Sequence, residues 1–205
     1  HYAFVVNAFV SLLKRADMTR YELFLRETRT YEIIEDVKNF RSEIGVLFLN
    51  SYNRDVLTKM FDDNRLTYTS LFKARPHIFV SKSNPLAKHE VVSLEDLEDF
   101  PYLSYDQGIH NSFYYSEEIL SQIPHKKSIV VSDRATLFNL LIGLDGYTIA
   151  TGILNSNLNG DNIVSIPLGI DDEIDIVYLK HEKATLSKMG EKFLDNLVKE
   201  VTFDN

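Results

Sequence analysis

The chain has 205 residues, which suits one domain or two lobes that share the chain. Lysine and arginine number 22 against 30 for aspartate and glutamate, so the net charge at pH 7 is −8. This balance argues against direct binding of duplex DNA, which needs basic side chains to neutralise phosphates. The lack of cysteine excludes disulfides and thiol chemistry, and no apolar stretch approaches the roughly 20 residues of a membrane span.

The first 89 residues predict helices and strands in alternation. Apolar side chains recur with helical spacing at the start, whereas the next stretch alternates apolar and charged side chains like a half-buried strand. A continuous apolar run further on is typical of a strand covered on both faces. The predicted elements are a helix over 1–15, a strand over 21–27, a helix over 30–42 with Thr30 as N-cap, a strand over 43–49, a helix over 54–64 and an extended stretch over 66–89.

The rest of the chain continues the alternation. Ser93 and Asp96 have the spacing of a capping box, and Gly146 follows a leucine stripe as a helix-ending glycine. The predicted elements are a helical turn over 93–100, a strand over 101–105, a helix over 111–123, a strand over 128–132, a helix over 134–145, strands over 147–153, 162–168 and 174–181, and a helix over 185–201.

Helices that alternate with strands favour mostly parallel sheets. The alternation falls into two blocks, and each block ends in an extended crossing with a helix breaker, Pro76 in one and 167–169 in the other. We therefore expect an α/β fold of two Rossmann-like lobes joined by two crossover strands, with a ligand cleft between the lobes. The expected boundaries are 1–72 with 170–205 for lobe I and 73–169 for lobe II.

Polar residues gather where the predicted strands end. In open α/β sheets, ligands bind beyond the carboxyl ends of strands, near helix N-termini, whose free N–H groups favour negative charge. Hydroxyl, amide and N–H groups at these positions suit a small anionic or zwitterionic ligand. The candidate ligand-binding residues are Thr28, Thr30, Asp106, Gln107, Gly108, Ser132 and Arg134.

Ordinary structural roles also account for several of these residues taken singly. Thr30 and either Ser132 or Asp133 have side chains typical of helix N-caps. Arg134 and Arg29 either hold a ligand carboxylate or sulfate, or form exposed salt bridges. Convergence of three strand ends on one cleft favours a ligand site, because residues that serve only as helix N-caps are not expected to lie together at one place.

The sequence lacks the motifs of catalysis. The six histidines lack the H-E-x-x-H spacing of a zinc site, and there is no G-x-S-x-G elbow, phosphate-binding P-loop or G-x-G-x-x-G fingerprint. His110 near Asp106 suggests a base with its orienting carboxylate, but two exposed loop residues explain the pair more simply. We therefore expect a protein that is not an enzyme and that needs no cofactor or metal.

Three segments resemble the effector-binding domain of LysR-type transcriptional regulators. They are RSEIGVLFL (41–49), FVSKSNPLAKHEVVSLEDLEDFPYLSY (79–105) and VVSDRATLFNLLIGLDGYTIATGIL (130–154), the last being the most specific. The resemblance extends over essentially the whole chain. Asn84 stands where the family usually has histidine, Glu43 replaces a polar or small residue, and 144–146 replaces the family's G-x-G.

The resemblance implies a type 2 periplasmic-binding-protein-like fold with a small effector, such as an organic acid, amino acid or sulfur metabolite, in the cleft. By position, the family's effector contacts fall on Thr28, Thr30, 106–108 and Ser132. The chain begins with His1, and the resemblance implies an upstream winged helix-turn-helix that alone contacts DNA. It further implies a cytoplasmic homodimer that is tetrameric at full length and makes no membrane contact. The alternative is a secreted solute-binding protein of a transporter with the same fold.

The helix predicted over 1–15 is apolar around much of its circumference, which is more than one sheet face can cover. Phe4, Phe9 and Leu12 lie on its second face. This face either pairs with another subunit, as the family's antiparallel side-by-side dimers imply, or packs under the C-terminal helix.

Overall fold

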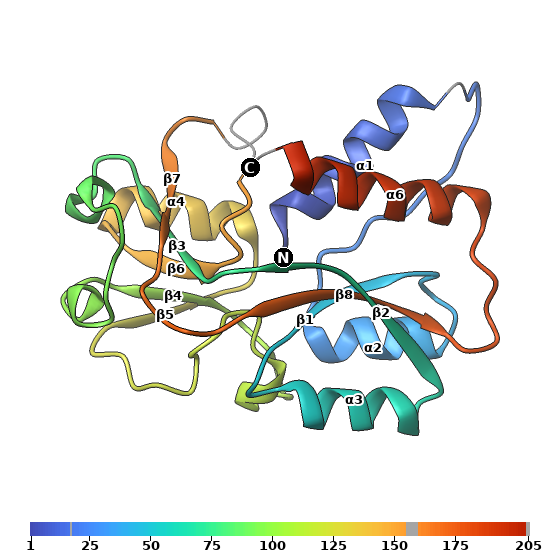
Figure 1. Ribbon diagram of the computed structural model, residues 1–205, viewed down its shortest axis with the longest axis horizontal. Coiled ribbons are helices and arrows are strands. Elements are labelled where there is room, and N and C mark those ends of the chain that lie inside the picture. The colour runs from blue at the N-terminus through green and yellow to red at the C-terminus, as the bar shows by residue number, and fades with distance from the viewer. Residues whose placement is uncertain (17, 155–159, 204–205) are drawn as a thin grey trace.

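The computed structural model describes residues 1–16, 18–154 and 160–203, which form two sheets with helices packed on them (Figure 1). The helices are α1 (Ala3–Arg15), α2 (Thr30–Lys38), α3 (Arg54–Asp63), α4 (Arg134–Leu144) and α6 (Lys188–Phe203). The strands are β1 (Gly45–Leu49), β2 (Leu66–Ala74), β3 (His77–Ser81), β4 (Tyr102–Tyr105), β5 (Ser128–Val131), β6 (Tyr147–Ala150), β7 (Ile163–Pro167) and β8 (Ile174–His181). Short 3-10 turns lie at Pro85–Lys88, Glu95–Leu97 and Phe113–Tyr115.

The three-stranded sheet has the order β1–β8–β2, and its central strand β8 is antiparallel to both neighbours. Alternate side chains of β8 enter two different cores, as the period of two in a strand requires. Val177 faces α2 and α3, where it packs in one buried cluster with Ile34 and Leu57. Ile176 faces α1 and α6 and shares a second cluster with Leu197. The sheet is therefore covered by helices on both faces (Figure 1).

The five-stranded sheet has the order β5–β4–β6–β3–β7. Helix α4 packs on one of its faces through Leu137 and Leu141, which contact Phe79 and Leu103. Among the pairings of the described strands, only those of β4 with β5 and β6 are parallel. The expectation of mostly parallel sheets was therefore wrong. The strands β3, β7 and β8 lead into or out of the crossings, and each is antiparallel to the strands that it pairs with.

Two crossings connect the sheets, at the places that the helix breakers predict. β2 leads through Pro76 into β3, and β7 leads through 168–173 into β8. The N–H of Leu168 donates to the carbonyl of Pro76 at 3.0 Å, so the crossings are hydrogen-bonded to each other. Buried side chains on both sides of the crossings, including Phe48 and Ile78, belong to one continuous core. This is the predicted α/β architecture of two lobes and two crossover strands.

Two predicted elements do not form. Residues 21–27 have no regular secondary structure and pair with no strand in the described parts of the chain. The predicted helix over 111–123 is replaced by the turn Phe113–Tyr115 and irregular backbone. Leu120 has a φ of 60°, which an α-helix does not accommodate. The strand predicted over 21–27 does not form, because a strand needs a neighbouring strand that takes up its N–H and C=O groups. An alternating pattern of side chains does not provide that neighbour.

The structure identifies the N-terminal caps of α2 and α4. Helix α2 has Arg29 as its N-cap, so the prediction of Thr30 was wrong. Thr30 is the first helical residue, and its N–H is free to bond elsewhere. At α4 the cap is Asp133 and not Ser132, because the Asp133 Oδ1 accepts the N–H of Thr136 at 2.8 Å.

The capping box at Ser93 and Asp96 is confirmed, since the Asp96 carboxylate accepts both the N–H and the hydroxyl of Ser93 at 2.9 and 2.8 Å. The expected helix-ending role of Gly146 is wrong. Asp145 adopts the left-handed conformation there, with a φ of 50°, and its carbonyl accepts the side-chain amide of Asn84 at 2.7 Å. Aspartate tolerates this conformation better than most residues, so no glycine is required.

The second apolar face of α1 packs inside the chain. Phe4 is buried and meets Phe72 edge to face at 5.5 Å between ring centroids, Phe9 meets Phe193 of α6 in the same way at 6.2 Å, and Leu12 is buried. Of the two alternatives, packing under the C-terminal helix is therefore the one that the structure shows for these residues.

One carboxyl is buried beside the five-stranded sheet. Glu118 is 3 % exposed, and its Oε1 accepts the backbone N–H of Tyr105 at 3.0 Å. Its other oxygen has no hydrogen-bond partner in the described parts of the chain. Burial, and then the nearby charge of Glu117, raise the pKa of Glu118 from 4.5 to about 8. The folded chain therefore holds a protonated carboxyl at neutral pH.

This buried carboxyl predicts a pH-dependent stability. The unfolded chain loses the Glu118 proton near pH 4.5 and the folded chain near pH 8, so the free energy of unfolding falls as pH rises between these values, by an amount on the order of 4 kcal/mol. Glu118→Gln removes this fall and stabilises the chain most at pH 8. Urea unfolding at pH 5, 6, 7 and 8 measures it. The exposed Glu90→Gln is the control, and equal slopes in the two variants contradict the assignment.

Candidate functional site

Gln107 connects the two sheets at the carboxyl end of β4. Its side chain is 7 % exposed, its Oε1 accepts the N–H of Thr30 at the start of α2 at 3.2 Å, and its Nε2 donates to Glu117 Oε1 at 3.1 Å. The first N–H of α2 has no partner within the helix, so a side chain from the other sheet supplies one. Two of the predicted ligand residues, Thr30 and Gln107, therefore meet in a direct contact.

A second contact joins the same loop to α2. The Arg29 Nη2 lies 2.6 Å from Asp106 Oδ2, and the N–H of Gly108 donates to Asp106 Oδ1 at 2.8 Å. The Gly108 N–H bond and the Arg29 contact lower the pKa of Asp106 and keep it ionised. Gly108 has a φ of 62°, and a Cβ atom there would lie 2.8 Å from the Arg29 guanidinium. A residue other than glycine would be strained at this φ and would displace the guanidinium.

A third contact links the start of α4 to the residues before α2. Arg134 forms a two-pronged ion pair with Glu27, with Nε to Oε1 at 3.0 Å and Nη2 to Oε2 at 3.2 Å. The side chains are 21 and 31 % exposed, so the pair is partly shielded from water. This geometry is the one that guanidinium groups use to bind carboxylates in general. The predicted ligand residue Arg134 is thus engaged by a carboxylate of the chain itself.

The remaining predicted residues lie differently. The Thr28 hydroxyl donates to the Glu32 carboxylate within the first turn of α2. Ser132 is exposed between β5 and the cap Asp133, and it makes no hydrogen bond in the described parts of the chain. Thr30, Asp106, Gln107, Gly108 and Arg134 are therefore in contacts that link elements of the two sheets, whereas Thr28 and Ser132 are not.

An open cleft of about 1200 Å³ lies between α2 and the loop after β4, and Glu27, Arg29 and Gln107 of these contacts line it. Four predicted ligand residues do not line it: Thr30, Asp106, Ser132 and Arg134. Thr28, Gln107 and Gly108 lie in its wall together with Tyr31 and His110, whose rings stack at 3.5 Å between centroids. Sequence reasoning missed Tyr31 and gave His110 no binding role. The helical stripe of α2 predicts which residues are buried, but not that the half-buried Tyr31 meets a ring from a distant loop.

Sequence reasoning also missed Glu27 and Glu117. Glu117 accepts the side-chain amide of Gln107, and it lies on the segment that was expected to be a helix. Glu27 lies on the segment that was expected to be a strand. In both cases the partner is far away in the sequence, and no local pattern marks an ion pair between distant segments.

The arrangement offers hydrogen-bond donors and cations for a small polar ligand, with aromatic rings beside them. Among the residues that the structure describes, no group of three or more histidine, aspartate or glutamate side chains is placed to hold a metal ion. Within the same residues, no helix is long and apolar enough to span a membrane.

Solved structures of LysR-family proteins have similar folds. The regulator HinK from Pseudomonas aeruginosa is 15 % identical with a TM-score of 0.59, over 96 % of this chain and 64 % of that one. The effector-binding domain of QuiR, solved with shikimate, is 16 % identical with a TM-score of 0.60, over 95 and 88 %. The BenM effector-binding domain, solved with its effector benzoate, is 17 % identical with a TM-score of 0.61, over 98 and 87 %. These likenesses show a type 2 periplasmic-binding-protein-like fold.

The chain covers only part of some of these proteins, namely 64 % of HinK and 60 % of another Pseudomonas aeruginosa protein of the LysR family. No curated protein is similar enough in sequence to match. A family model described as the LysR substrate binding domain matches residues 13–202, a range that includes the three contacts of the cleft. The chain therefore belongs to the LysR substrate-binding domain family.

Proposed function

We propose that the chain binds a small anionic or zwitterionic metabolite and thereby regulates a LysR-type transcription factor. The observation that supports this most is the meeting of the α2 N-terminus, Arg29 and Gln107 from both sheets at one cleft. N–H groups at helix starts and guanidinium groups both favour negative charge. Two structural neighbours of similar fold are described with carboxylic acids, shikimate and benzoate.

Each candidate residue has a proposed role. The Ser132 hydroxyl donates to the ligand. The Thr28 hydroxyl, the Gln107 amide and the N–H groups of Thr30 and Gly108 exchange their bonds within the chain for bonds to the ligand, and Arg134 leaves Glu27 to pair with a carboxylate or sulfate. Asp106 accepts an ammonium group if the ligand is zwitterionic. Organic acids, amino acids and sulfur metabolites all have suitable groups.

We further propose that the ligand acts by drawing two lobes together, 1–72 with 170–205 against 73–169. The chain is acidic, with a net charge of −8, so DNA contact belongs to a winged helix-turn-helix outside this sequence. In the full-length protein, a homodimer that assembles into a tetramer in the cytoplasm would transmit the lobe movement. A ligand shifts this equilibrium only by its different affinity for the two arrangements, about 1–3 kcal/mol in typical cases.

The alternative of a secreted transporter component is not favoured, because the family that matches nearly the whole chain is one of regulators. We propose also that the domain is not an enzyme. A regulatory family supports this, and so does the direct pairing of His110 with Tyr31 and not with a carboxylate.

The site assignment predicts the effect of a bulky residue at Ser132. Millimolar benzoate, shikimate, sulfate and the common amino acids are screened by thermal unfolding, and a ligand at 100 times its Kd stabilises the fold by about 2.7 kcal/mol. Ser132→Phe is expected to abolish the shift that the best compound produces. Because Ser132 is exposed, the variant keeps the melting temperature of the unliganded chain.

The matched control is Ser128→Phe, since Ser128 is exposed at the opposite end of the same strand β5. It is expected to retain the full ligand shift. Equal shifts in both variants mean that Ser132 lies outside the site, and no shift with any compound in the unaltered chain argues against the proposed ligand class.

The Glu27–Arg134 pair predicts competition with an anionic ligand. A ligand carboxylate that pairs with Arg134 must displace Glu27, so Glu27→Gln is expected to tighten binding of the best anion roughly two- to fivefold, the value of a partly exposed ion pair. Isothermal titration calorimetry measures the change. Glu43→Gln, whose carboxylate instead contacts Ser187, leaves the affinity unchanged. Weaker binding by Glu27→Gln contradicts the displacement.

A further inference from the structure

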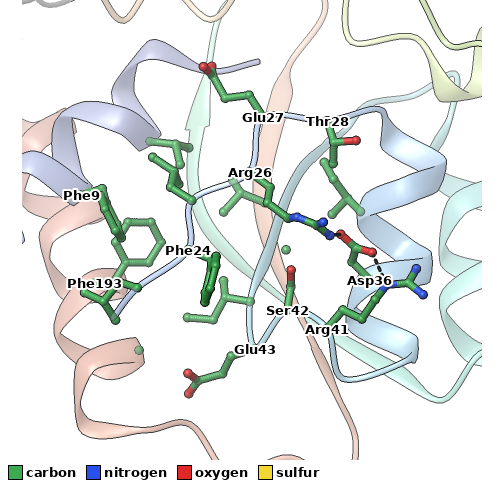
Figure 2. Close-up of a pocket in the computed structure, with 18 of the residues that line it drawn as sticks. Phe9, Phe24, Arg26, Glu27, Thr28, Asp36, Arg41, Ser42, Glu43 and Phe193 are labelled. Carbon is green, nitrogen blue, oxygen red and sulfur yellow. Dashed lines mark hydrogen bonds and ion pairs between the residues drawn. The ribbon is translucent and has the colours of Figure 1, made fainter. Parts of the chain in front are cut away.

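Glu118 differs from the other buried carboxyl residues in the described parts of the chain, because it has no cationic partner. Asp36 and Asp175, which are 6 and 5 % exposed, both pair with arginine. Figure 2 shows Asp36 between the guanidinium groups of Arg26 and Arg41, at 2.7 and 2.6 Å. A buried carboxylate needs such a partner, because water no longer stabilises its charge. Glu118 keeps its proton instead, and one of its oxygens has no hydrogen bond among the described residues.

Glu118 lines a small cavity to which both sheets contribute. Phe48 of β1 and Ile174 of β8 come from the three-stranded sheet, and Phe79 of β3 and Ile149 of β6 come from the five-stranded sheet. The volume of about 50 Å³ has room for roughly three to five water-sized groups. The cavity therefore suits a compact polar head group and not a whole metabolite.

Arg134 lines the same cavity from the start of α4, so a cation and a buried carboxyl border one small space. Its partner Glu27 is partly exposed, and the role proposed above for Arg134 is to leave Glu27 for a ligand carboxylate. Because the cavity is only a few atoms across, an ammonium group one carbon away from that carboxylate comes within reach of Glu118. These two groups side by side are the head group of an α-amino acid.

The charges around Glu118 favour a cation. Glu117 is its neighbour in the chain, and the negative charge that helps to raise the pKa of Glu118 also attracts an ammonium group. Glu117 accepts the amide of Gln107, which lines the larger cleft, so the cavity adjoins that cleft. Aromatic rings in the wall attract cations as well. The other charged or titratable groups near Glu118 are His1, Tyr2, Tyr102, Tyr105 and Arg134.

We propose that this cavity binds the head group of an α-amino acid, with the ammonium group on Glu118 and the carboxylate on Arg134. The inference rests on the proposed function and narrows its ligand class from anions in general to zwitterions. On binding, Glu118 releases its proton to solvent, and the carboxylate accepts an N–H of the ammonium group. Asp106, the acceptor named above, already holds the N–H of Gly108 and pairs with Arg29, whereas Glu118 has an oxygen without a donor.

Glycine and glycolate test the head group, because one has an ammonium group where the other has a hydroxyl. In equilibrium dialysis of the radiolabelled compounds against the full-length protein at pH 7, glycine is expected to bind at least about tenfold more tightly, the value of a hydrogen bond to a charged group. Its affinity is expected to rise about tenfold from pH 6 to pH 7. Glycine stays zwitterionic in this range, while the ionised fraction of Glu118 rises tenfold per pH unit below its pKa of about 8.

Glu118→Gln is the decisive variant, because the amide still accepts the N–H of Tyr105 but cannot carry a negative charge. It is expected to lose the preference for glycine and the pH dependence, and to keep the binding of glycolate. Glu90→Gln, at an exposed position, is the control and behaves like the unaltered protein.

Unchanged glycine binding by Glu118→Gln overturns the proposal, and so does a loss of glycine binding in Asp106→Asn alone. Glycolate that binds as tightly as glycine to the unaltered protein also overturns it, as does the absence of binding by either compound at tens of millimolar. The Ser132→Phe experiment is decided by anions, so a failure of the head-group site leaves the assignment of the cleft standing.

Discussion

The pairing of β8 with both β1 and β2 is the interaction on which the rest of the structure depends. β8 comes from residues 174–181, whereas its neighbours come from the first 74 residues, so the first sheet exists only after the chain has crossed to the second sheet and returned. Its alternate side chains fill two cores, one with α2 and α3 and one with α1 and α6. The hydrogen bond between Leu168 and Pro76 holds the two crossings side by side. It thereby helps to fix the position of one sheet relative to the other.

The cleft is a consequence of that placement. The N-terminus of α2 lies opposite the carboxyl end of β4, and Gln107 takes up an N–H that no helix can satisfy internally. The same neighbourhood favours Gly108, because its φ of 62° strains other residues and a Cβ there would displace the Arg29 guanidinium. The two ion pairs beside it, Arg29 with Asp106 and Arg134 with Glu27, are partly exposed and individually weak.

Backbone hydrogen bonding explains why sequence patterns succeeded in some elements and failed in others. The strands at 45–49 and 174–181 pair with each other, and the patterns that predicted them are confirmed. The pattern at 21–27 is equally strand-like, but the strand does not form without a partner. At 111–123 the apolar spacing favoured a helix. The buried Glu118 instead accepts the N–H of Tyr105 at the end of β4, and Leu120 turns left-handed, so tertiary contacts replaced the helix.

The sequence by itself determined the α/β class, the helices at 3–15, 134–144 and 188–203, the crossings at Pro76 and 167–169, and the resemblance that the family match confirms. These follow from periodicity and from helix breakers, which act over a few residues. Only the tertiary structure decided that most strand pairs are antiparallel, that α6 covers Phe9, and that Glu27 reaches Arg134. Each of these joins segments far apart in the chain, and a local pattern has no information about which distant segment satisfies a hydrogen bond, a charge or an apolar face.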